Sequence, residues 1–283
     1  MAGGRPFFKM SGSGNDFVFF DASREGESDI TGADKIAAIC SRRTGVGADG
    51  VVFMRRQDDR NLTIRYYNAD GSLGELCGNA TLCSVRLATD LGLVSRGEVS
   101  IHTDAGIMRA RMADELAEID LATVVDIRES AAGIERLDRE SQLGFALVGV
   151  PHIVIVDRDV STADIDGRGA MLRRHPSLPD GANVNFLSQG MDGEWLIRTF
   201  VRGVEGETLA CGTGAVASGI LLTAWGLVEG AVRLVTRSGR RLVVRPGKAG
   251  AFWNPSLKGA ATLVFSGNLG EFDGPDCASS ASG

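Results

Sequence analysis

Short apolar runs, rich in β-branched and aromatic residues and bounded by Gly, Asp, Asn or Ser, recur along the whole chain. Runs of this kind are typical of β-strands. They predict strands at residues 17–20, 51–54, 62–67, 98–102, 107–112, 117–121, 145–150, 153–157, 184–187, 195–201, 232–236, 241–244 and 261–265.

Helical periodicity is confined to a few segments, which are residues 34–40, 79–91, 167–174 and 213–225. Predicted strands outnumber predicted helices by a wide margin. This excess favours an α+β architecture over a doubly wound parallel sheet, in which strands and helices alternate.

The chain also resembles itself. Leu76-Cys77-Gly78-Asn79 opens one predicted helix, and Ala210-Cys211-Gly212-Thr213 opens another 134 positions later. At that same offset residues 47–53 match residues 181–187, and residues 18–21 match residues 154–157 with a shift of two. We therefore predict two pseudo-symmetric halves, residues 1–125 and 126–260, rather than a single mixed domain. The last strand, residues 261–272, is expected to join the first half, and residues 273–283 to form a flexible tail.

Composition narrows the possible partners. The 283 residues are 43% hydrophobic and 23% charged, with a net charge of −6, which is typical of a soluble globular protein. Without a basic block, nucleic acid is not an expected partner. Without a long apolar run, neither a membrane span nor a secretion signal is expected. Five cysteines without a paired spacing predict a reduced, cytoplasmic protein with no metal site.

Cys77 and Cys211 are the candidate reactive groups because each immediately precedes a glycine and the first turn of a predicted helix. The positive end of a helix dipole and the free N–H groups of its first turn are expected to lower a thiol pKa and to bind a carboxylate. Cys40, Cys83 and Cys277 lack this setting and are interpreted as structural residues.

Two such thiols on opposite sides of a bound carboxylate suit one reaction without a cofactor. One thiolate removes a proton from an α-carbon while a thiol delivers another to the opposite face. N–H groups aimed at the carboxylate stabilise the negative charge that develops there.

The sequence resembles the diaminopimelate epimerase family. The resemblance extends from Phe8 to about Phe272 and rests on a series of motifs in the family's order. They are Lys9-Met10 through Gly14-Asn15-Asp16-Phe17, Arg43 through Gly50, Asn68-Ala69-Asp70-Gly71-Ser72 leading to Cys77-Gly78-Asn79, Pro151-His152, Asn183 through Phe186, and Arg202-Gly203 leading to Cys211-Gly212-Thr213-Gly214.

The resemblance implies a fold of two halves, each a β-barrel-like mixed sheet around a central helix. It implies an isomerase that interconverts LL- and meso-diaminopimelate without pyridoxal phosphate or any other cofactor, on the route to lysine and peptidoglycan, commonly as a homodimer. Cys77 and Cys211 match the catalytic thiols. The implied substrate-binding residues are Asn15 near the reaction centre, Gly78, Asn79, Gly212 and Thr213 around the reacting carboxylate, Asn68, Asn185 and Arg202 at the distal carboxylate, and His152 beside the first thiol.

The sequence departs from the family's usual pattern in three places. One is Ala80-Thr81-Leu82, which stands where the family usually has Gly-Ala-Arg after Cys-Gly-Asn. Val150 stands where the family usually has Asn before Pro-His, and Val201 stands where it usually has Glu before the arginine. The family's glutamate contacts the distal amino group of the substrate. Glu205 and Glu207 are the nearby candidates to replace it.

Three alternatives follow. A related cofactor-independent racemase with a different side-chain pocket would accommodate both valines. A thiol–disulfide redox protein would use the two cysteines as a pair and would be active in the oxidised form. A carboxylate-binding module would bind its ligand without exchanging the α-hydrogen.

Overall fold

The computed structural model describes residues 4–25, 30–74 and 77–270. Cys277 and the predicted tail lie outside these residues. Up to residue 120 the elements are β1 (Arg5–Gly12), β2 (Asn15–Asp21), α1 (Ala22–Glu25), α2 (Ala33–Cys40), β3 (Gly50–Arg56), β4 (Asn61–Asn68), β5 (Leu73–Gly74), α3 (Gly78–Asp90), β6 (Val99–Thr103), β7 (Gly106–Ala113) and β8 (Leu116–Asp120).

The second group of elements continues to the end of the described chain. It consists of β9 (Ile127–Arg128), β10 (Glu140–Val148), β11 (Val150–Asp157), a 3-10 turn (Val160–Thr162), α4 (Ile165–Arg173), β12 (Asn183–Gln189), β13 (Trp195–Val201), β14 (Gly206–Thr208), α5 (Gly212–Ala224), β15 (Val232–Val235), β16 (Arg241–Arg245), β17 (Lys248–Ala249), β18 (Phe252–Trp253), β19 (Ser256–Gly259) and β20 (Ala261–Leu269).

Strand pairing repeats between the two groups. β2 and β3 are parallel, as are β11 and β12. β4 is antiparallel to β3 and parallel to β6, and β13 is antiparallel to β12 and parallel to β15. The central helices α3 and α5 follow β5 and β14, respectively. The predicted α+β fold with two similar halves is confirmed.

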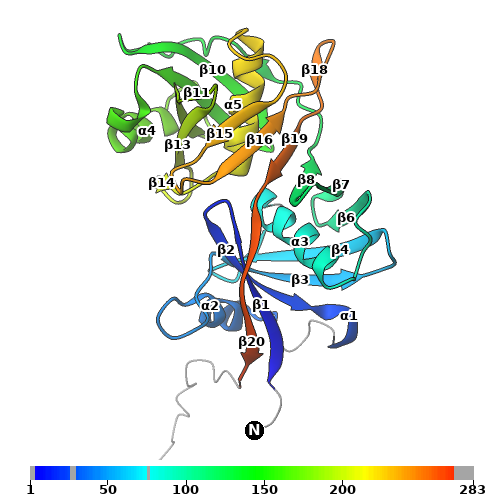
Figure 1. Cartoon of the computed structure of the whole chain (residues 1–283). Coiled ribbons are helices and arrows are strands. Elements are labelled where there is room, and N and C mark those ends of the chain that lie inside the picture. Colours follow the sequence, from blue (N-terminus) through cyan, green and yellow to red (C-terminus); the bar gives the residue numbers. More distant parts are fainter. Residues whose placement is uncertain (1–3, 26–29, 75–76, 271–283) are drawn as a thin grey trace, which may run out of the picture.

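The halves are joined by strands as well as by side chains. β8 of the first half pairs with β19 of the second, so the described strands, apart from the β17–β18 pair, form one continuous sheet rather than two closed barrels. Two further strands connect the halves, because each follows a strand of one group and pairs with a strand of the other. β9 leaves β8 to pair with β10, and β20 leaves β19 to pair with β1. Figure 1 shows β19 running into β20 between the two groups of strands.

The largest hydrophobic core lies around the two central helices and is continuous between the halves. It includes Leu82 of α3, Leu221 of α5 and Leu257 of β19, all fully buried. Because both helices are packed on most sides, their first turns hold fixed positions at the junction of the halves.

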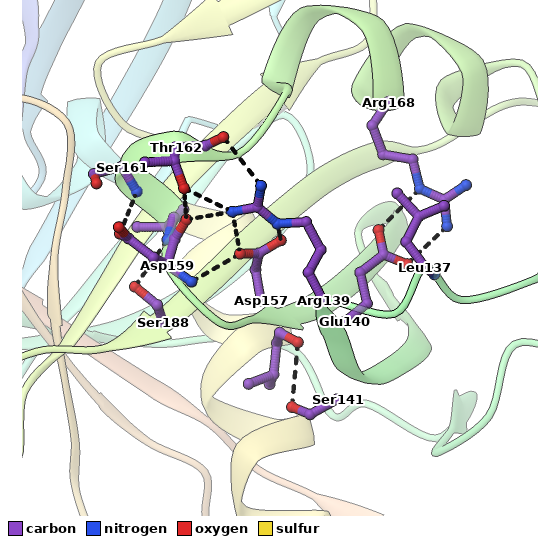
Figure 2. Close-up of polar contacts among 12 residues, drawn as sticks. Leu137, Arg139, Glu140, Ser141, Asp157, Asp159, Ser161, Thr162, Arg168 and Ser188 are labelled. Carbon is purple, nitrogen blue, oxygen red and sulfur yellow. Dashed lines mark hydrogen bonds and ion pairs between the residues drawn. The ribbon is translucent and has the colours of Figure 1, made fainter.

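Ion pairs secure the outer layer of the second half (Figure 2). Arg139 bonds Asp157 through two nitrogens, at 2.8 Å each. Arg168 of α4 bonds Glu140 of β10 at 2.9 and 2.8 Å, and both side chains are buried. These contacts, with the bonds from Arg139 to Asp159 and Thr162, attach α4 and the loop after β11 to the sheet.

Candidate active site

Cys77 and Cys211 occupy equivalent positions, as the repeat predicts. Each is the N-cap of its central helix, with φ −131° and ψ 110° at Cys77 and φ −138° and ψ 114° at Cys211. Each carbonyl accepts the first helical hydrogen bond, from the N–H of Thr81 or Ala215, at 2.9 Å in both cases. Both residues are partly buried.

The two helix starts meet each other. A β-carbon placed on Gly212 would lie 3.9 Å from the Cα of Gly78 and 3.7 Å from Asn79 Oδ1. Leu257 packs beneath both glycines, 3.6 Å from such a carbon at Gly78 and 3.3 Å from one at Gly212. The junction therefore brings two sets of free N–H groups to one place, where a carboxylate can bind between them. Leu257 gave no signal in the sequence beyond its hydrophobicity.

The expected lowering of the thiol pKa values is wrong. Burial raises the pKa of Cys77 to about 11, although the backbone N–H groups of Ala80 and Asn79 act in the opposite direction. Burial also raises the pKa of Cys211, opposed by Thr213 and the N–H of Gly214. Desolvation of the thiolate thus outweighs the helix termini at both positions.

Asn15 and Asn79 are in direct contact. Asn79 Nδ2 donates to Asn15 Oδ1 at 2.7 Å, and Asn15 Nδ2 donates to Asp49 Oδ2 at 2.9 Å. Asn79 is buried, and its Oδ1 has no hydrogen-bond partner among the described residues. The structure therefore brings Asn15, Gly78, Asn79 and Gly212 together.

His152 and Asn185 form a second buried contact, behind α5. Asn185 Nδ2 lies 3.2 Å from His152 Nδ1 and donates to the Ile153 carbonyl at 3.0 Å, while Thr199 donates to Asn185 Oδ1 at 3.0 Å. Because both N–H groups of the Asn185 amide are engaged, it holds no free donor for a carboxylate. Burial and the nearby Arg202 lower the pKa of His152 to about 3, so the ring is neutral.

Arg202 lies beyond this contact, with its guanidinium bonded to the Asp180 carbonyl at 2.7 Å. Its backbone N–H donates to Asn183 Oδ1, also at 2.7 Å, which makes Asn183 a neighbour that the sequence reasoning did not single out. Asn68 donates to Ser72 Oγ at 2.9 Å at the end of β4. Among the described contacts, none joins Asn68 to Arg202.

Two of the departures from the family pattern, Val150 and Val201, lie at strand ends. Val150 begins β11, Val201 ends β13, and both are partly buried. Neither glutamate offers a free carboxylate in their place. Glu205 pairs with Arg173 and Arg174 at 3.0 and 2.8 Å, and Glu207 pairs with Arg198 at 2.6 Å.

Comparisons with known proteins identify the family of this chain. A family model for diaminopimelate epimerase matches residues 7–125 and 144–250. The chain belongs to the diaminopimelate epimerase family. It is 43% identical to a diaminopimelate epimerase of Gemmatimonas aurantiaca over 93% of this chain and 98% of the relative. It is 34% identical to one of Aquifex aeolicus, over 94% and 98% of the two chains.

Solved structures with low sequence identity share the fold. A phenazine biosynthesis protein of the PhzF family from Bacillus anthracis matches with a TM-score of 0.73 at 13% identity, covering 94% of this chain and 98% of that one. A hydroxyproline epimerase from Agrobacterium vitis matches with a TM-score of 0.66 at 16% identity, covering 94% and 92%. Within the described residues, no helix is both long and apolar enough to span a bilayer.

Proposed function

We propose that this member of the diaminopimelate epimerase family interconverts LL- and meso-diaminopimelate with Cys77 and Cys211 as its acid–base pair. As an isomerase of this family it belongs to diaminopimelate and lysine biosynthesis. The observation that carries the two-thiol mechanism is the pairing of two cysteine N-caps at equivalent places on two helices whose first residues meet.

In each turnover one thiolate takes the α-proton and becomes a thiol. The other thiol gives its proton to the opposite face of the same carbon and becomes a thiolate. The electron pair of the broken C–H bond passes into the adjacent carboxylate and returns to form the new C–H bond. The roles of the two sulfurs are then exchanged, and the reverse reaction restores them.

The carboxylate of the reacting centre binds the N–H groups of Gly78, Asn79, Gly212 and Thr213, and its developing charge is stabilised by both helix termini. Arg202, whose backbone N–H donates to Asn183, receives the distal carboxylate, and Asn68 at the end of β4 contacts it from the other half. Arg202 then exchanges its bond to the Asp180 carbonyl for a charge-assisted pair.

Proton NMR of LL-diaminopimelate in D₂O with reduced protein tests the proposal. Loss of the α-hydrogen signal together with formation of the meso isomer is the expected result. Substrate that keeps its α-hydrogen would overturn the assignment of diaminopimelate.

A second candidate is a related cofactor-independent racemase with a different side-chain pocket. Val150 and Val201 favour it because they offer no acceptor for a distal ammonium, and Glu205 and Glu207 are already paired. Solvent exchange with another amino acid, and none with diaminopimelate, would select this candidate.

A cytoplasmic homodimer completes the proposal. Among the described strands β20 pairs only with β1, and its side chains Leu263, Val264 and Phe265 are 46, 56 and 47% exposed. An exposed apolar edge strand is suited to pairing with a second copy. Sedimentation at micromolar concentration tests this, and a monomer would contradict it.

A further inference from the structure

Four hydrogen-bonded side chains, those of Arg42, Asp49, Asn15 and Asn79, form a relay that leads from the surface to the start of α3. Arg42 donates to Asp49 Oδ1 at 2.6 Å. Asp49 Oδ2 accepts from Asn15 Nδ2 at 2.9 Å and from the backbone N–H of Asp16 at 3.2 Å. Asn15 Oδ1 in turn accepts from Asn79 Nδ2 at 2.7 Å.

The negative charge of Asp49 determines the direction of the two amide hydrogen bonds that follow it, from Asn15 and from Asn79. A carboxylate only accepts hydrogen bonds, so Asn15 must turn its NH₂ group toward Asp49. Its oxygen then faces Asn79, and Asn79 must donate. If either amide rotated by half a turn, two oxygens or two NH₂ groups would face each other, and hydrogen bonds would be lost at a partly buried place.

The free end of the relay is the Oδ1 of Asn79, which is buried and without a partner among the described residues. It lies 3.7 Å from the position of a β-carbon on Gly212, at the junction of the two helix starts. The backbone groups that the two helix starts offer to a ligand are N–H donors, so this oxygen is an acceptor placed among donors.

We propose that Asp49, held by Arg42, is a positioning residue that fixes the amides of Asn15 and Asn79 and thereby presents Asn79 Oδ1 as an acceptor at the reaction centre. An α-amino acid matches this arrangement because its carboxylate accepts from the N–H groups while its ammonium donates to Asn79 Oδ1. The inference rests on the proposed function and assigns Asp49 a part in selecting amino acids over acids without an amino group.

Other charged groups near the relay support its geometry. Asp16, next to Asn15, pairs with Lys9 at 2.7 Å and with Arg42 at 2.8 Å. Arg42 thus bridges the two carboxylates and holds Asp49 against Asn15. The charge of Asp49 also contributes to the raised pKa of Cys77. That effect does not depend on the side chain at position 79.

A double-mutant cycle with Asp49→Asn and Asn79→Ala separates these roles. We expect Asp49→Asn to lower kcat/KM for diaminopimelate exchange about tenfold in the wild-type background, chiefly through KM. In the Asn79→Ala background it should lower kcat/KM less than about twofold, because the relay no longer ends in an acceptor. Its effect on the Cys77 thiol is the same in both backgrounds and cancels. Equal losses in the two backgrounds would overturn the proposal.

A readout independent of activity is the side-chain amide NMR of Asn15 and Asn79. Hydrogen exchange of both amides should accelerate in Asp49→Asn, and the matched control Asp59→Asn, at an exposed carboxylate outside the relay, should leave them unchanged. Unchanged exchange in a folded Asp49→Asn would also overturn the proposal. If that variant fails to fold, Arg42→Met, at a side chain 60% exposed, repeats both measurements. If wild type does not exchange diaminopimelate, the proposed function fails, while the amide measurement still decides the relay.

Discussion

Gly214 and Asn185 pack so closely that a β-carbon on the glycine would lie 2.2 Å from Asn185 Oδ1. The same glycine donates its N–H to Cys211 Sγ at 3.3 Å. We predict that Gly214→Ala lowers the free energy of unfolding by about 1–3 kcal/mol because the buried amide must move. Thermal melts measure this. Gly97→Ala, where such a carbon meets nothing closer than Ser95 Oγ at 3.8 Å, is the control and should melt near wild type.

Replacing either Cys77 or Cys211 by Ala should abolish epimerisation and leave the fold intact, since both thiols are only partly buried and each supplies a proton-transfer step. Isomer formation is followed by NMR, and folding by circular dichroism. Cys40→Ala, at a buried cysteine outside the junction, should retain activity. Full activity in either single variant would contradict the two-thiol mechanism.

The raised thiol pKa values predict that kcat/KM increases toward alkaline pH. A group whose pKa is raised to about 11 is protonated at neutral pH, so the thiolate fraction of Cys77 increases as pH rises. We expect kcat/KM, which reports the free enzyme, to increase by up to about tenfold per pH unit from about pH 7 to about pH 9. It should fall again when the second thiol loses its proton. A flat profile over this range would mean that a thiolate is already present in the free enzyme.

His152 predicts a loss of stability in acid. Its pKa is about 3 in the folded protein and about 6.5 when unfolded, so the unfolded chain binds the extra proton between these values. The contribution of His152 is complete above about pH 6.5. Below that it falls by up to about 1.4 kcal/mol per pH unit. Denaturant unfolding of wild type and His152→Gln at several pH values tests this, and parallel pH dependences would rule it out.

The buried pair of Arg168 and Glu140 predicts an asymmetric response (Figure 2). Glu140→Gln should lower the free energy of unfolding by about 3–5 kcal/mol, because the guanidinium loses its countercharge in a buried site. The double variant Arg168→Met with Glu140→Leu should regain most of that loss. Additive losses in the double variant would show that hydrogen bonding to the rest of the loop, rather than charge, dominates.

Much of the architecture was predictable from the sequence because the repeat and the strand patterns are local signals. The four predicted helices are found within about two residues of their expected ends. β1 and β19 were missed, as were the shorter α1, β5, β9, β14, β17 and β18. β1 contains Lys9 and ends in Ser-Gly, and β19 is a four-residue segment, so both are strands because of the neighbours with which they pair.

The site could be predicted from the sequence only where a single residue type at a recognisable position indicates its chemistry. Cysteine before glycine at a helix start predicted the location of both thiols. The pKa direction was wrong because burial, which depends on the whole fold, outweighs the helix termini. Asp49 and Thr199 act through the amides of Asn15 and Asn185, and such contacts between distant segments leave no trace in local spacing.

The pairing of β9 with β10 and of β20 with β1 has a consequence for how the two halves are held together. β9 follows β8 but pairs with β10, and β20 follows β19 but pairs with β1, so each group of strands is completed by a strand that continues directly from the other group. Neither half is a severable module, because removing one would leave β1 or β10 of the other with a bare edge. The two halves are therefore expected to unfold together. The backbone pairing of their strands fixes the position of one cysteine relative to the other.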